Sequence, residues 1–173
     1  LKKYRGKDGV VLVEDECRVA KESNLQAIWY PKGKYPEIKV ATEREGKSFY
    51  GALNVKTGQC HIKKIEGMQI SQRTVEFLEY LEKFYAGKKV LLIWDGAPWH
   101  RGRVKEYLKR KNRKCWLEIA YFPPYSPDLN PQEHVWKLAK KSTCHNSEFE
   151  FSIKLKKFQS YICRKIFATD FLK

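Results

Sequence analysis

The sequence predicts a layered α/β fold in which helices flank a mixed, five-stranded sheet. Two continuous apolar runs that end in an acidic residue are typical of buried central strands. Other segments carry apolar residues at helical spacing, and they alternate with strands after an initial β-meander. No internal repeat or low-complexity linker divides the 173 residues, so we expect one domain.

Strand character is strongest in short apolar segments that are bounded by turn residues. A turn at "KTGQ" joins two of these segments and so predicts the meander. In chain order, the predicted strand segments are "GVVLVEDE", "PEIKVATE", "KSFYGALNV", "CHIKKI", "KKVLLIWD" and "CWLEIAYF".

Helical spacing of apolar residues predicts the helices. A helix over Ser71–Ala86 would bury one face, and Gly87 is well placed to end it. A second helix is predicted over Arg101–Lys114, a third from Pro131, and a last amphipathic helix follows. We expect the apolar stripe of the last helix to pack in the core: Phe151, Leu155, Phe158, Ile162 and Ile166.

The charge of the chain indicates an anionic partner. Thirty-five Lys and Arg against twenty Asp and Glu give a net charge of +15. Such a field attracts polyanions, nucleic acid first and anionic membrane second. The helix predicted over Arg101–Lys114 carries eight basic residues against the single Glu106. It either contacts the DNA backbone or presents a solvated basic face. The candidate contacts are Arg101, Arg103, Lys105, Lys109 and Arg110.

Several protein classes are excluded by the same composition. No apolar run approaches the ~20 residues that span a membrane, and the N-terminus has no signal-peptide pattern. The five cysteines are scattered and form no Cys-x-x-Cys pair, which argues against a disulfide framework and a zinc finger. We expect reduced thiols in a cytosolic protein.

A proline-rich loop precedes the third helix. The segment "YFPPYSPDLNPQEHVW" holds four of the seven prolines, and each proline removes backbone freedom. Asn130 is a good N-cap, Pro131 suits the first helical position, and the side chain of Glu133 can reach back to the backbone N–H of the cap. This loop would fix where the helix begins.

Three carboxylates stand at places where a sheet of this kind gathers ligands. Asp15 and Asp95 are predicted at the ends of the two apolar strands, and Glu133 in the first turn of a helix. Taken singly, each aspartate could merely end its strand in solvent. Together they form an oxygen-only set suited to Mg²⁺ or Mn²⁺. Two such ions about 4 Å apart can support displacement at a phosphodiester. Along the first strand, Asp15 lies on the face opposite Glu14 and Glu16.

Three blocks of the chain resemble mariner-type insertion-sequence transposases, the IS-six-thirty group of the DDE superfamily. They are "VLVEDECRV", "LLIWDGAPWHRG" and "YFPPYSPDLNPQEHVWKLAKK", and the resemblance runs from about Val10 to Lys141. It implies an RNase H-like fold with Asp15, Asp95 and Glu133 as the metal-binding catalytic triad. Gly96 departs from the usual Asn, and the 38 positions from Asp95 to Glu133 are more than in common members.

The resemblance also implies an activity and partners. We expect cleavage at transposon ends and strand transfer into target DNA, with two Mg²⁺ or Mn²⁺ ions and a homodimer in the full-length protein. A prokaryotic, cytoplasmic protein that associates with the nucleoid is expected. The alternatives are a non-catalytic DNA-binding remnant and a purely hydrolytic RNase H-like nuclease. Helix-turn-helix modules precede the catalytic domain in this group, and the chain has no room for them; it starts at Leu1 and is expected to be part of a longer protein.

Two further candidates are accessory. His100 matches a histidine that the group often has five residues after the second acid, and it could act near metal or phosphate or make a structural hydrogen bond. For Asn130, the role of helix N-cap is favoured over the role of metal ligand. Trp99 either packs or touches a base.

Overall fold

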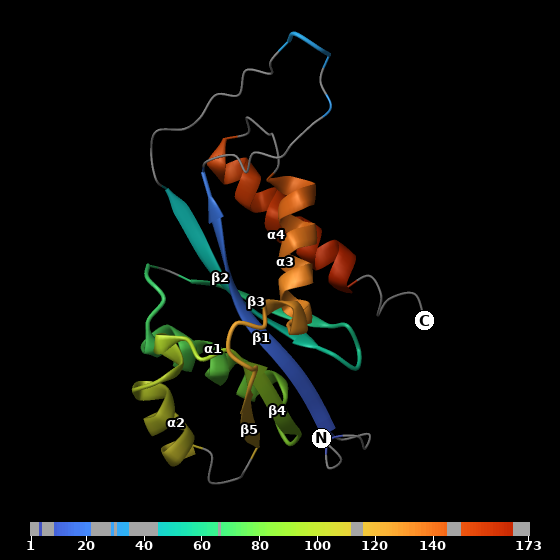
Figure 1. Cartoon of the computed structure of the whole chain (residues 1–173). Coiled ribbons are helices and arrows are strands. Elements are labelled where there is room, and N and C mark those ends of the chain that lie inside the picture. Colours follow the sequence, from blue (N-terminus) through green and yellow to red (C-terminus); the bar gives the residue numbers. More distant parts are fainter. Residues whose placement is uncertain are drawn as a thin grey trace.

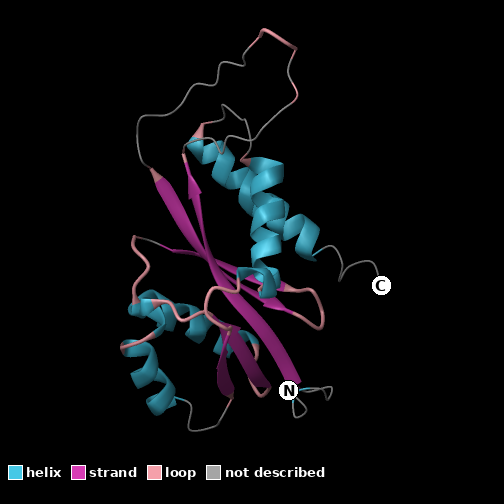
Figure 2. Cartoon of the chain, in the orientation of Figure 1, coloured by secondary structure: helices cyan, strands magenta, loops and turns pink. Residues whose placement is uncertain are grey.

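The computed structural model describes Tyr4 and residues 9–21, 29, 31–34, 45–65, 67–111, 116–144 and 150–167, without the side chains of residues 111 and 163–167. Figure 1 and Figure 2 show their arrangement. The strands and helices, in chain order, are β1 (Gly9–Ala20), β2 (Gly46–Asn54), β3 (Cys60–Ile65), α1 (Ser71–Phe84), β4 (Lys89–Trp94), α2 (Arg103–Lys111), β5 (Leu117–Tyr121), α3 (Pro131–Thr143) and α4 (Phe151–Phe167).

The sheet is mixed and five-stranded, in the order β3-β2-β1-β4-β5. β1, β2 and β3 pair antiparallel as a meander, whereas β4 and β5 run parallel to β1. A short turn is enough to join antiparallel neighbours, as between β2 and β3, but each parallel step needs a crossover, which α1 and α2 supply. The predicted sheet and its strand count are confirmed.

Helices cover both faces of this sheet (Figure 1). Alternate residues of β1 point to opposite faces. Leu12 packs in the core formed with α1 and α2, while Cys17 and Val19 pack in the core formed with α3 and α4. Leu12 has no exposed surface. The alternation therefore places Asp15 on the α3 side and Glu14 on the α1 side of one strand.

Several predicted boundaries need correction. β1 does not end at its acids but continues to Ala20, because β2 pairs with it along its whole second half. The second helix begins at Arg103 rather than Arg101, after a separate 3₁₀ turn over Pro98–His100. Its predicted end at Lys114 lies outside the described residues. The predicted strand "PEIKVATE" lies outside the described residues.

The first helix ends close to its predicted position. α1 stops at Phe84 rather than Ala86, and Gly87 adopts a positive φ of 79° just past it, as expected. In α4, Phe151, Phe158 and Ile162 are buried, as the apolar stripe predicted.

Across the described residues, no helix is both long and apolar enough to cross a membrane.

Candidate active site

The first two acids come from neighbouring parallel strands. The pairing between β1 and β4 ends at Val13 and Ile93, so Asp15 and Asp95 both lie two residues beyond it. Asp95 follows the last residue of β4 and is exposed, whereas Asp15 is half-buried within β1. β4 stops where β1 continues, and this places the aspartates side by side at one edge of the parallel part of the sheet.

The third acid is positioned by the start of α3. The Asn130 side chain accepts a hydrogen bond from the backbone N–H of Gln132 at 3.0 Å, and Pro131 occupies the first helical position. The Asn130 amide also donates to the backbone carbonyl of Glu14 at 3.0 Å. Asn130 therefore caps α3 and ties its first turn, which carries Glu133, to β1.

The reach-back bond predicted for Glu133 is wrong. The backbone N–H of Asn130 donates to Pro127 instead, at 2.9 Å, because a 3₁₀ turn over Pro127–Leu129 occupies it. The Glu133 carboxylate is left free to pair with Lys137, one helical turn on, at 3.5 Å.

Asp15, Asp95 and Glu133 line one cavity of about 740 Å³, together with Asn130 and Arg101. The proline-rich loop supplies much of the remaining wall, including Tyr121, Phe122 and Tyr125. Acids separated by 80 and 38 positions in the chain thus meet at the same hollow. Their role as metal ligands stays a prediction.

The electrostatics of the cavity fit a divalent cation. Burial, together with the nearby charges of Glu16, Glu133 and Asp95, raises the pKa of Asp15 to about 7. The three carboxylates therefore repel one another across the cavity. A hydrogen bond from His100 lowers the pKa of Asp95, so this acid stays ionised. An oxygen-only donor set of this kind is what Mg²⁺ and Mn²⁺ prefer.

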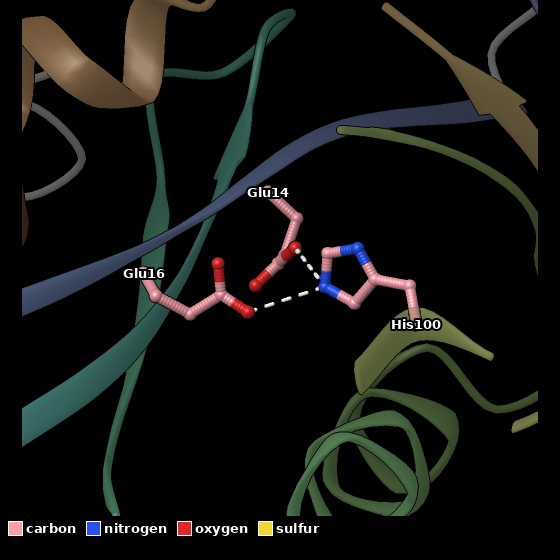
Figure 3. Close-up of side chains that lie close together, drawn as sticks. All are labelled: Glu14, Glu16 and His100. Carbon is pink, nitrogen blue, oxygen red and sulfur yellow. Dashed lines mark hydrogen bonds and ion pairs between the residues drawn. The ribbon is translucent and has the colours of Figure 1, made fainter. Parts of the chain in front are cut away.

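His100 contacts Asp95 and also a second group of acids that the sequence did not predict. Figure 3 shows this second group, Glu14 and Glu16, beside the His100 ring. Its Nδ1 lies 3.2 Å from Asp95 Oδ1 and its Nε2 lies 3.2 Å from Glu16 Oε1 and 3.5 Å from Glu14 Oε2. Although burial lowers its proton affinity, the contacts with Asp95, Glu16 and Glu14 raise the pKa of His100 to about 10. His100 therefore makes the structural contacts that were one of its two predicted roles, and its ring links two sets of acids. A role near metal stays a prediction.

Aromatic side chains hold this histidine in place. The Trp94 ring stacks on His100 with centroids 4.1 Å apart and an interplanar angle of 5°. Trp99 donates its indole N–H to the Glu16 carboxylate. Of the alternatives for Trp99, packing beside the site is the one observed.

The predicted basic contacts divide into two groups. Arg101 lines the cavity with the three acids, and Arg101 and Lys105 also line an adjoining hollow of about 320 Å³. Arg103 instead bonds Gln72 at 2.7 Å. Lys109 and Arg110 are exposed on α2, outside both hollows. A basic surface thus starts at the acids and continues along α2.

Comparison with known proteins identifies the chain's relatives. The profile of a family described as DDE superfamily endonuclease matches residues 10–156. The insertion element IS630 uncharacterized 39 kDa protein of Shigella sonnei is 25% identical over 142 residues, which cover 80% of this chain and 40% of the relative. The uncharacterized protein y4pE/y4sA of Sinorhizobium fredii (strain NBRC 101917 / NGR234) is 34% identical over 64 residues, covering 37% of this chain and 43% of that protein. The chain spans less than half the length of either relative.

Solved structures share the fold. The Mos1 transposase paired-end complex with left transposon end matches with a TM-score of 0.66 at 15% identity, over 91% of this chain and 48% of that one. The mariner Mos1 paired end complex with Mg gives 0.63 at 16% identity, over 95% and 51%. The catalytic domain of Mos1 mariner transposase gives 0.56 at 16% identity, over 87% and 67%. The predicted RNase H-like fold is confirmed by these matches.

Proposed function

The chain belongs to the DDE superfamily endonucleases, and from this membership we propose that it is the catalytic domain of a transposase. Asp15, Asp95 and Glu133 are its proposed catalytic residues. The observation that carries the proposal is that these acids, from two strands and a helix, line one cavity. The likeness to Mos1 complexes that hold transposon DNA supports the same function.

A divalent metal fits the residues at this cavity. Asp15 and Asp95 would hold it from the sheet, and Glu133 from the first turn of α3. Two Mg²⁺ or Mn²⁺ ions, when bound, would activate the attacking oxygen and stabilise the leaving oxygen of a phosphodiester. A mariner Mos1 paired end complex that contains Mg shares the fold, and this supports the choice of metal.

The neighbouring residues would hold these ligands in place. His100 fixes the Asp95 carboxylate through Nδ1, and Asn130 fixes the turn that carries Glu133. Arg101 is close enough to line the same cavity and would bind a phosphate of the DNA strand. Lys105, Lys109 and Arg110 would extend this contact along the backbone without reading sequence.

The proposed reaction has two steps in one cavity. Water would first attack a phosphodiester at the transposon end and release a 3′-hydroxyl. That hydroxyl would then attack a phosphodiester of target DNA, joining the strands and releasing a new 3′-hydroxyl. We propose that the full-length protein does this as a homodimer, since two transposon ends must be joined to one target.

The test is cleavage and joining by the full-length protein. Supercoiled plasmid is incubated with Mg²⁺ or Mn²⁺, and nicked and joined products are separated on gels. We expect Asp15→Asn, Asp95→Asn and Glu133→Gln each to reduce both products by at least 10³-fold. Asp128→Asn is the matched control. Asp128 is an exposed acid of the proline-rich loop and does not line the cavity.

The outcomes separate the competing functions. Nicking without joining of a 3′-hydroxyl oligonucleotide would point to a purely hydrolytic nuclease. DNA binding with no metal-dependent product would point to a non-catalytic remnant. Either result contradicts the proposed strand transfer, and full activity of the Glu133→Gln variant would remove Glu133 from the site.

A further inference from the structure

A second set of metal-ligating side chains lies on the opposite face of β1 from Asp15. One carboxylate oxygen from Glu14, one from Glu16 and a ring nitrogen of His100 all lie within 4.8 Å of one another (Figure 3). We propose that these three side chains form a separate binding site for one divalent cation of borderline character such as Zn²⁺. This inner cation site (Glu14, Glu16 and His100) is distinct from the cavity that Asp15, Asp95 and Glu133 line.

The strongest sign of a missing ligand is Glu14. Its side chain is 1% exposed, and neither carboxylate oxygen has a hydrogen-bond partner among the described residues. The nearest cationic group is His100 Nε2 at 3.5 Å, beyond a well-formed hydrogen bond. Removing an ionised carboxylate from water is costly unless a charge or several hydrogen bonds replace the water. A cation bound between Glu14 and Glu16 would replace it.

The histidine is oriented as metal-binding histidines are. His100 Nδ1 faces the backbone carbonyl of Asp95 at 3.1 Å and its carboxylate at 3.2 Å. A ligating histidine almost always donates its other ring N–H to such an acceptor, which fixes the ring and aims the free nitrogen at the metal. Stacking on Trp94 fixes the same ring from its face. Nε2 is thereby directed at Glu14 and Glu16.

The remaining contacts complete the shell around the site. Trp99 donates to one oxygen of Glu16, so this carboxylate is oriented without being neutralised. The side chains of His100 and Glu16 are 1% and 6% exposed, so little water reaches the group. Trp94 stacks on His100 and Trp99 donates to Glu16, and neither ring carries a positive charge.

The donor set decides which cation fits. Two carboxylates and one imidazole balance the charge of a divalent ion, and they leave a fourth position open. An imidazole ligand favours Zn²⁺ over Mg²⁺, Ca²⁺ and Mn²⁺, which prefer oxygen ligands. Two protonated states compete with the metal. A proton on His100 Nε2 would make the ring an imidazolium between the acids, and a proton on Glu14 would neutralise a carboxyl whose pKa burial raises well above its usual value. Protonation brings one positive charge to the site, whereas the metal brings two.

Cation binding is tested with the catalytic cavity disabled. In the Asp15→Asn/Glu133→Gln double variant of the untagged chain, Co²⁺ is titrated and its visible absorption recorded, and Zn²⁺ is titrated by calorimetry. We expect one ion per chain. Adding Glu14→Gln or His100→Gln should weaken binding at least 10-fold, whereas adding Asp128→Asn should change nothing. This readout does not use DNA or catalysis, so it fails or succeeds independently of the proposed transposase activity.

A second measurement does not depend on whether the Glu14→Gln variant folds. X-ray absorption of the Zn²⁺-loaded Asp15→Asn/Glu133→Gln variant, which retains Glu14, identifies the atoms that bind the metal. We expect one imidazole nitrogen with the remaining ligands oxygen. Sulfur ligands, no binding to the double variant, or unchanged affinity after His100→Gln would each overturn the inner cation site. Nitrogen NMR showing His100 protonated at both ring nitrogens under saturating Zn²⁺ would overturn it as well.

Discussion

The side-chain amide of Asn130 donates a hydrogen bond to the backbone carbonyl of Glu14, 3.0 Å away, and so joins the start of α3 to the strand that carries Asp15. Because Asn130 is buried, few other groups can compete for this bond. The same side chain accepts from the backbone N–H of Gln132. One residue therefore sets both the helix start and its distance from the sheet, and through them the place of Glu133.

Removing this side chain should loosen the third acid. We expect Asn130→Ala to lower the free energy of unfolding by about 1–2 kcal/mol, the range for losing a helix cap, and to reduce metal-dependent DNA cleavage. Asn130→Asp keeps the acceptor that caps Gln132 but loses the donor to Glu14. Urea unfolding should show Asn130→Asp with a smaller loss of stability and a comparable loss of cleavage. Equal cleavage by the parent, Asn130→Ala and Asn130→Asp proteins would contradict the role of Asn130 in positioning Glu133.

Gly51 sets how closely α3 approaches the sheet. It pairs with Asp15 across β1 and β2, and a Cβ added there would lie 2.3 Å from Trp136 Cζ2 and 2.5 Å from Gln132 Nε2. Gly51→Ala should therefore push α3 outward, lower stability by about 1–3 kcal/mol, the range for overpacking, and move Glu133 away from Asp15.

The control for this substitution is Gly96→Ala, where an added Cβ meets no atom within 4 Å. Thermal unfolding of both variants measures stability, and Mn²⁺ titration measures the catalytic cavity. We expect Gly51→Ala to lose both stability and affinity, and Gly96→Ala to keep them. A Gly51→Ala protein of undiminished stability would show that α3 does not pack against the sheet as described.

The exposed basic residues of α2 should contribute salt-dependent affinity for DNA. A Lys105→Gln/Lys109→Gln/Arg110→Gln variant removes three charges from α2. For each DNA phosphate that these side chains neutralise, the slope of log affinity against log salt should become shallower by about 0.9 in the variant. Fluorescence anisotropy with labelled duplex measures both the affinity and the slope. A Lys83→Gln/Lys88→Gln/Lys89→Gln variant removes equal charge from other exposed positions, and equal effects in both variants would argue against a localised DNA surface.

Acid should destabilise the fold through His61. Burial lowers the pKa of this histidine to about 4, whereas an unfolded histidine titrates near 6.5. The unfolded state therefore binds the proton first as the pH falls. The stability that neutral His61 contributes is complete above pH 6.5 and is lost between pH 6.5 and 4, with an upper limit of roughly 3 kcal/mol.

Urea unfolding between pH 4 and 7 measures this contribution. Other groups also titrate in this window, so the quantity of interest is the difference between the parent and His61→Gln. We expect a flatter pH dependence for His61→Gln and an unchanged one for His134→Gln, whose side chain is exposed. The same pH dependence in parent and His61→Gln would show that His61 does not titrate abnormally.

The sequence predicted the parts of this site that depend on local pattern. Strand alternation placed Asp15 and Glu14 on opposite faces, and capping rules placed Glu133 at a helix start. The link from His100 to Glu16, 84 positions apart, could not be predicted, because it depends on how the 3₁₀ turn after β4 meets the far face of β1. Two acids alternating on one buried face, Glu14 and Glu16, were the available signal that this face also needed a cation.

The capping bond expected of Glu133 failed for a comparable reason. The 3₁₀ turn over Pro127–Leu129 already satisfies the backbone N–H of Asn130, and the proline pattern does not reveal that turn. Local rules placed the helix start correctly but could not decide which partner each group takes.

The central claim is that Asp15, Asp95 and Glu133 hold divalent ions together. Anomalous diffraction from crystals of the chain soaked in Mn²⁺ tests it most directly. We expect Mn²⁺ peaks inside the cavity, each bound by oxygens from at least two of the three acids, and their loss in Glu133→Gln crystals. A cavity without Mn²⁺ at saturating concentration, or peaks that ignore all three carboxylates, would contradict the claim.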